Sequence, residues 1–196
     1  MNTDSFREQL LDYVLSGHAY LHAPTTEKTR FLTELKSLAE SLPDGGRRIF
    51  VWSQATGWRD ADDQPAKSTS GTEFGPPDPQ KVPQEILDLP EEVICVLKDF
   101  GFYLQHKTYS YADVVTAWLC EIRDVLAHTG RTVIFLGPEL DLPAALVNDV
   151  TTVEFPLPDD GAIEQSVKFV MEGHKFDNAV LPSVVSACRG MTQQQV

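Results

Sequence analysis

The sequence predicts a three-layer α/β fold with a mostly parallel sheet. Short apolar runs, which suit buried strands, alternate along the chain with longer amphipathic segments, which suit helices. The run "VICVLK" is continuously apolar, which is typical of a parallel strand buried on both faces. The chain has 196 residues and 42% hydrophobic residues, enough for one domain with a full core.

Five short apolar runs are expected to form the sheet. The run within "EEVICVLKDF" (91–100) suits its centre, and the last run lies within the segment "VTTVEF" (150–155). The five predicted strands are Ala19–His22, Ile49–Ser53, Val93–Leu97, Val133–Leu136 and Val153–Phe155.

Amphipathic segments between these runs predict the helices. One apolar face carries Phe6, Leu10 and Val14, and a second helix follows a cap at Thr25 or Thr26. Further helices are expected after "PLPDD" (156–160) and over Asn178–Cys188. A helix over Tyr111–His128 is expected to bury one face formed by Val114, Val115, Trp118, Leu119, Ile122 and Leu126.

The segment 57–83, "GWRDADDQPAKSTSGTEFGPPDPQKVP", interrupts this alternation. It is rich in Pro, Gly, Asp and Ser and has almost no hydrophobic periodicity, so we expect a long, partly mobile surface loop. Trp58 and Phe74 have two interpretations: they anchor the loop to the core, or they are exposed contacts for a partner.

Composition and charge restrict the class of protein. Sixteen Lys and Arg residues against 29 Asp and Glu residues give a net charge of −13, which argues against a general nucleic-acid role. No apolar run approaches the roughly 20 residues of a membrane span, and the N-terminus lacks the pattern of a signal peptide. Three widely spaced cysteines fit reduced thiols, so a cytoplasmic location is expected.

The stretch "HAPTTEKT" (22–29) has the layout of a phosphate-binding loop, G-x-x-x-x-G-K-[ST], but contains no glycine. His22 and Glu27 stand at the two glycine positions, and Pro24 lacks an N–H group. Lys28 and Thr29 match the end of the motif. The stretch is therefore either a vestigial nucleotide site or an ordinary helix start with a threonine cap.

Asp99 ends an apolar strand, as a magnesium-associated carboxylate does in nucleotide hydrolases. Such enzymes often place a glutamate next to it as a base, and here Phe100 stands there. Segment 144–150 has no arginine that could reach a neighbouring subunit's nucleotide. The five histidines show no paired ligand spacing, so we expect no metal site and assign no catalytic residue.

Several segments resemble, in sequence and order, the N-terminal domain of a bacterial and plastid group of AAA+ ATPases. They include "YLHAPTTEKTRFL", "VICVLKDFGFYL", "VEFPLPD" and "ACRGMT", and the most specific is "TVIFLGPELDLPAALVNDVTTVEFPLPD". The resemblance runs from Phe6 to the C-terminus apart from 57–83. In that group a degenerate ATPase-like domain precedes a second domain that keeps the complete nucleotide motifs.

The resemblance implies an AAA-type sheet of five strands in the order 5-1-4-3-2. It places an ATPase-like domain at 1–176 and the start of a helical lid, or a linker, at 177–196. The chain would be a fragment of such an ATPase or a stand-alone relative of its first domain.

Three functions are compatible with these observations. The first is a non-catalytic domain without a cofactor that contacts a protein partner or a C-terminal ATPase domain, in a homo-oligomer or another assembly. The second is an ATP–magnesium-binding or hydrolysing domain that uses Lys28, Thr29 and Asp99. The third is an adaptor that binds a client through loop 57–83 with Trp58 and Phe74.

Overall fold

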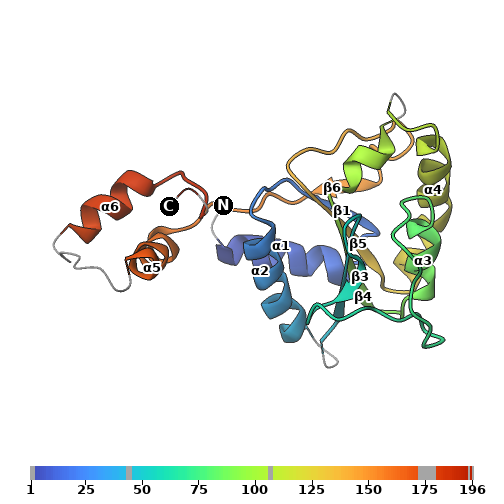
Figure 1. Cartoon of the computed structure of the whole chain (residues 1–196), viewed down its shortest axis with the longest axis horizontal. Helices are drawn as coiled ribbons and strands as arrows, with labels where there is room; N and C mark the ends of the chain where they lie inside the picture. The colour runs from blue at the N-terminus through green and yellow to red at the C-terminus, as the bar shows by residue number, and fades with distance from the viewer. Residues whose placement is uncertain (1–2, 43–45, 106–107, 172–179, 194, 196) are drawn as a thin grey trace.

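The chain forms a sheet between two layers of helices, with a helical pair at the C-terminal end (Figure 1). The computed structural model describes residues 3–42, 46–105, 108–171, 180–193 and 195. Within these residues six strands form one sheet in the order β3-β2-β4-β5-β1-β6. The strands are β1 (Tyr20–Ala23), β2 (Arg48–Ser53), β3 (Gly57–Asp60), β4 (Val93–Lys98), β5 (Thr132–Leu136) and β6 (Val150–Thr152).

Five of these strands are parallel, as predicted. Counted along the chain without β3, their order β6-β1-β5-β4-β2 is the expected 5-1-4-3-2. The sixth strand, β3, pairs antiparallel with β2 at the edge, so the predicted number of five strands was wrong.

Helices cover both faces of this sheet (Figure 1). One face carries α1 (Thr3–Leu15) and α2 (Lys28–Ser41), and the other carries α3 (Val82–Asp88) and α4 (Ala112–His128). A short 3-10 helix, η2 (Phe100–Leu104), follows β4 directly. The three-layer prediction is therefore confirmed.

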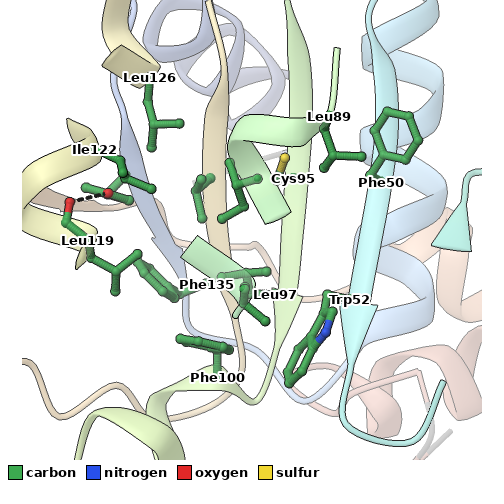
Figure 2. Close-up of a cluster of buried hydrophobic side chains, with 14 of the residues drawn as sticks. Phe50, Trp52, Leu89, Cys95, Leu97, Phe100, Leu119, Ile122, Leu126 and Phe135 are labelled. Carbon is green, nitrogen blue, oxygen red and sulfur yellow. Dashed lines mark hydrogen bonds between the residues drawn. The ribbon is translucent and has the colours of Figure 1, made fainter. Parts of the chain in front are cut away.

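Alternating residues of β4 show how one strand serves two cores. Ile94 and Val96 pack against α1 and α2, whereas Cys95 and Leu97 pack against α3 and α4. Figure 2 shows the second of these clusters, in which side chains of α4 meet those of β4 and β5. Because β4 is buried on both faces, a continuously apolar sequence is what this position requires.

The last strand and the long loop differ from the sequence prediction. The predicted strand Val153–Phe155 was wrong, because β6 ends at Thr152 and the Phe155 ring leaves the sheet to pack against Phe6 and Phe31. The predicted loop 57–83 was wrong at both ends. Its first four residues form the strand β3, and its last two residues, 82 and 83, are the first residues of α3. The hairpin from β2 into β3 is short, and Gly57 has a φ of 67°, which favours glycine.

The C-terminal helices α5 (Asp160–Val170) and α6 (Leu181–Cys188) pack on each other around their own small apolar cluster. In Figure 1 they lie to the left of the three layers. Helix α5 follows "PLPDD", as predicted, and the expected division at 176/177 stays a prediction. Residues 178 and 179 of the predicted helix Asn178–Cys188 lie outside the described residues.

Candidate nucleotide-binding site

The candidate site lies at the carboxyl ends of three neighbouring strands. The loop 24–27 leaves β1 and enters α2, Asp99 follows β4, and Gly137 follows β5. Parallel pairing of β5 with both β1 and β4 brings these three chain segments to one edge of the sheet. The residues predicted from the phosphate-loop motif and from the strand end are therefore brought together.

Glu27 is the one charged residue of this loop and is buried, with 4% of its surface exposed. Its Oε2 accepts hydrogen bonds from Arg30, at 2.6 Å from Nη2 and 3.2 Å from Nε. Its Oε1 accepts a hydrogen bond of 2.5 Å from the backbone N–H of Gln193. Both carboxylate oxygens of Glu27 therefore have hydrogen-bond partners. This fixes a negative charge at the position of the second glycine in the phosphate-loop motif.

Arg30 joins the loop to the segment that follows β6. Its side chain is 12% exposed, and its Nη2 also donates to the carbonyl oxygen of Pro156. Its guanidinium carbon lies 4.0 Å from the centre of the Phe155 ring, in a cation–π contact. Arg30 was not singled out from the sequence, although its spacing of three residues from Glu27 on a helix start is a signal for such a pair.

Two backbone donors at the end of the loop are used within the loop itself. The N–H of Glu27 donates to Oγ1 of Thr25 at 3.0 Å, and the N–H of Lys28 donates to the carbonyl oxygen of Thr26 at 3.0 Å. Pro24 has no N–H to offer. In a working phosphate loop such N–H groups turn inward toward the phosphates.

Lys28 and Asp99 form an ion pair between Nζ and Oδ2, with side chains 30% and 39% exposed. Asp99 has a φ of 53°, in the left-handed region, and its N–H donates to the carbonyl oxygen of Leu136 at 2.9 Å. A Cβ atom at Gly137 would lie only 3.1 Å from Oδ1 of Asp99, so glycine leaves room for this carboxylate. Thr29 is exposed in the first turn of α2.

His22 and Phe100 complete the floor of the site. Nε2 of His22 lies 3.2 Å from the carbonyl oxygen of Gly137 and therefore carries the proton of the neutral ring. Burial lowers the pKa of His22, against the opposing effect of this hydrogen bond. Phe100 is buried against Trp52, with ring centres 5.4 Å apart. The cavity beside them has a volume of about 10 Å³, room for about one water molecule.

Trp58 and Phe74, the candidate partner contacts, lie elsewhere, on the α3 side of the sheet. Trp58 is buried on β3, and its Nε1 donates to Oε2 of Glu85 at 2.9 Å. Phe74 packs on it with ring centres 6.1 Å apart. Burial raises the pKa of Glu85, which the hydrogen bond from Trp58 opposes. This arrangement corresponds to the anchoring interpretation.

The part of the chain that the structure describes has neither a membrane-spanning helix nor a cluster of metal-binding side chains. None of its helices is long and apolar enough to cross a membrane. It also contains no cluster of three or more His, Cys, Asp and Glu side chains that could hold a metal ion.

The family of this chain follows from a profile match. The family described as "SpoVK-like AAA ATPase, N-terminal domain" matches residues 6–155, well over half of the chain. The chain belongs to this family. The expectation of an AAA+ ATPase-type N-terminal domain is thereby confirmed.

A curated relative agrees with this assignment. The uncharacterized AAA domain-containing protein ycf46 of Guillardia theta is 23% identical over 106 residues, which are 53% of this chain and 20% of that protein. The chain thus spans about a fifth of the length of this curated relative.

The structural neighbours show the same fold at low sequence identity. One neighbour is a chain in the HORMA:CdnC:Trip13 complex of E. coli MS115-1, with a TM-score of 0.60 and 10% sequence identity. The match covers 93% of this chain and 72% of that neighbour's chain. The FIGL-1 AAA domain, solved in complex with ADP, has a TM-score of 0.59 and 13% sequence identity. The match covers 97% of this chain and 65% of the FIGL-1 chain.

Proposed function

We propose that the chain is a non-catalytic ATPase-like domain that acts through protein–protein contact. Its partner is an ATPase domain of the same protein or another protein, whose assembly or regulation it serves. The observation that carries this proposal is the buried carboxylate of Glu27, fixed by Arg30 inside the loop that has the layout of a phosphate-binding motif.

The charges at the site argue against nucleotide binding. Arg30 is paired with Glu27 and Lys28 with Asp99, so two positive groups are matched by two negative ones. A phosphate beside Glu27 would meet a like charge, and two unit charges about 4 Å apart repel by about 4 kcal/mol at an effective dielectric of about 20. Displacing Glu27 would in turn leave Arg30 without its buried partner.

The residues needed for magnesium and for hydrolysis do not fit either. Asp99 would have to release Lys28 before it could face a hydrated Mg²⁺ ion. Phe100, at the position of the usual base, cannot accept a proton and is packed into the core. ATP and Mg²⁺ are therefore not assigned to this domain.

The FIGL-1 neighbour was solved with ADP, which makes nucleotide binding the alternative to exclude. Under this alternative, Lys28, Thr29 and Asp99 would form the site. The adaptor alternative, with Trp58 and Phe74 as client contacts, requires both rings to leave their packing on the core. The neighbour in the HORMA:CdnC:Trip13 complex shows an AAA-like chain within a multiprotein assembly, in line with a role in protein contacts.

Calorimetry with ATP and Mg²⁺ tests the proposal. We expect binding no tighter than millimolar in the wild type, because each lost contact of about 1.4 kcal/mol weakens affinity tenfold. Lys28→Ala should behave like the wild type. Glu27→Gly alone should not restore binding, because Pro24 and the internally bonded N–H groups remain. Micromolar binding that Lys28→Ala abolishes would instead establish the nucleotide-binding alternative.

A further inference from the structure

Helix α4 exposes a stripe of apolar side chains to solvent. Val114, Trp118 and Val125 are 51%, 36% and 45% exposed. Their spacings of four and seven residues place them on one side of the helix. We call these three residues, together with Glu121 between them, the α4 stripe.

The α4 stripe is separate from the face that α4 packs on the sheet. That face carries Val115, Leu119, Ile122 and Leu126, all buried. At about 100° per residue, the stripe lies roughly a quarter-turn around the helix from this buried face. The expectation that Val114 and Trp118 belong to the buried face was therefore wrong, because about half of the Val114 surface and about a third of the Trp118 surface are exposed.

Charge identifies the kind of partner that fits. Glu121 lies within the stripe, one turn from both Trp118 and Val125, and is exposed without an ion pair among the described residues. Asp124 is exposed next to the stripe, and Arg123, the basic residue nearby, is already bonded to Asp124 and Asp149. A partner surface must therefore combine apolar side chains with a positive charge opposite Glu121.

We propose that the α4 stripe docks an amphipathic helix of a protein partner, with apolar residues against Trp118 and a Lys or Arg side chain against Glu121. This inference rests on the proposed role in protein contacts and names the surface that performs it. The stripe from Val114 to Val125 spans about 16 Å, three turns of helix, which suits a helix laid alongside. Exposed apolar patches with a polar border are typical of such interfaces.

A second copy of this chain is a poorer occupant. In a parallel pairing of two α4 helices, the two Glu121 side chains would face each other. In an antiparallel pairing centred on the stripe, they would still lie within about one turn of each other. Like charges in these positions oppose association, whereas a basic partner helix gains from the same carboxylate.

The three tryptophans provide a direct readout. Trp52 and Trp58 are 0% and 4% exposed, so Trp118 is the tryptophan that acrylamide can reach. The probe is a synthetic peptide of about 18 residues with leucines on one helical face and lysines beside them. We expect it to shift Trp118 emission to shorter wavelength and to protect it from quenching. A scrambled peptide of the same composition should bind at least tenfold more weakly.

Substitutions at exposed positions complete the test, with a fluorescein-labelled peptide and anisotropy as the readout. Trp118→Ser should weaken binding about tenfold or more, as expected for a central aromatic contact. Glu121→Lys should weaken the lysine peptide and strengthen a glutamate counterpart. Leu15→Ser, at an exposed apolar position on α1, should change nothing. Circular dichroism confirms that each variant is folded.

Several results would overturn this inference. Equal binding of the scrambled peptide, or unchanged binding by Trp118→Ser or Glu121→Lys, would show that the stripe does not select such a helix. Protection of Trp118 that grows with protein concentration, without peptide, would assign the stripe to a second copy. Calorimetry with ATP reports on Lys28 and Glu27 alone, so failure of the proposed function and failure of this inference are distinguishable.

Discussion

Replacing Arg30 by methionine removes one member of the buried pair in the degenerate loop. Glu27 is 4% and Arg30 12% exposed, so the pair lies in a region of low dielectric. Removing one partner of a buried pair costs about 3–5 kcal/mol, because the other charge is left unpaired. Glu27 keeps the N–H of Gln193, so we expect the lower end, about 3 kcal/mol.

Urea unfolding at pH 7 measures this loss. A urea m value of about 2–3 kcal/mol/M gives a midpoint lower by about 1–1.5 M. For a chain of this size, the thermal midpoint should fall by about 6–12 °C. The double variant Glu27→Gln/Arg30→Met removes both charges, and we expect it to recover most of the lost stability. A double-mutant cycle then gives the coupling between the two side chains.

Lys168→Met is the matched control, because it removes a lysine from the exposed pair with Glu164 on α5. Its midpoint should equal that of the wild type, as is usual for exposed pairs. The reasoning is refuted if Arg30→Met shifts the midpoint no more than Lys168→Met does. It is also refuted if the double variant is as unstable as Arg30→Met alone.

Three further outcomes are expected. Gly137→Ala should cost about 1 kcal/mol in urea unfolding, because the new Cβ would crowd Asp99; an unchanged midpoint would contradict the close approach. Burial lowers the pKa of His22, so the unfolded chain takes up a proton first below about pH 6.5 and stability falls from there down to the depressed pKa. His22→Gln should flatten this part of the pH profile, and an unaltered profile would exclude His22 as its cause. Hydrogen exchange should be slow at the paired β3 amides and fast over 70–80; uniform protection across 57–83 would refute this contrast.

The parallel part of the sheet could be predicted because its signals are local. Continuous apolar runs such as Val93–Leu97 and amphipathic segments between them identify a layered α/β fold without knowledge of distant contacts. The strand β3 could not be found in this way. Its four residues, Gly57–Asp60, gain their partners from β2 through a hairpin and bury Trp58 against α3, which a polar, aperiodic sequence does not reveal.

The site shows the same division between local and distant information. The motif spacing indicated Lys28 and the end of an apolar strand indicated Asp99, and the structure pairs them. Arg30 was missed because its importance depends on Pro156 and Phe155, more than 100 residues away. The face of α4 was misjudged for a related reason: its 3.6-residue periodicity is compatible with more than one apolar stripe, and packing decides which is buried.

The proposed function requires that the Glu27–Arg30 pair prevents a phosphate group from binding at this loop. An ATP titration that follows the loop residue by residue is the most direct test of this requirement. Backbone amide resonances of residues 25–29 would be followed by NMR as ATP and Mg²⁺ are added to the wild-type chain. We predict no saturable shift of these amides below millimolar ATP, because the N–H groups of Glu27 and Lys28 are bonded within the loop and both side chains are already paired. Saturation at micromolar ATP, confined to residues 25–29 and Asp99, would contradict the assignment of a non-catalytic domain.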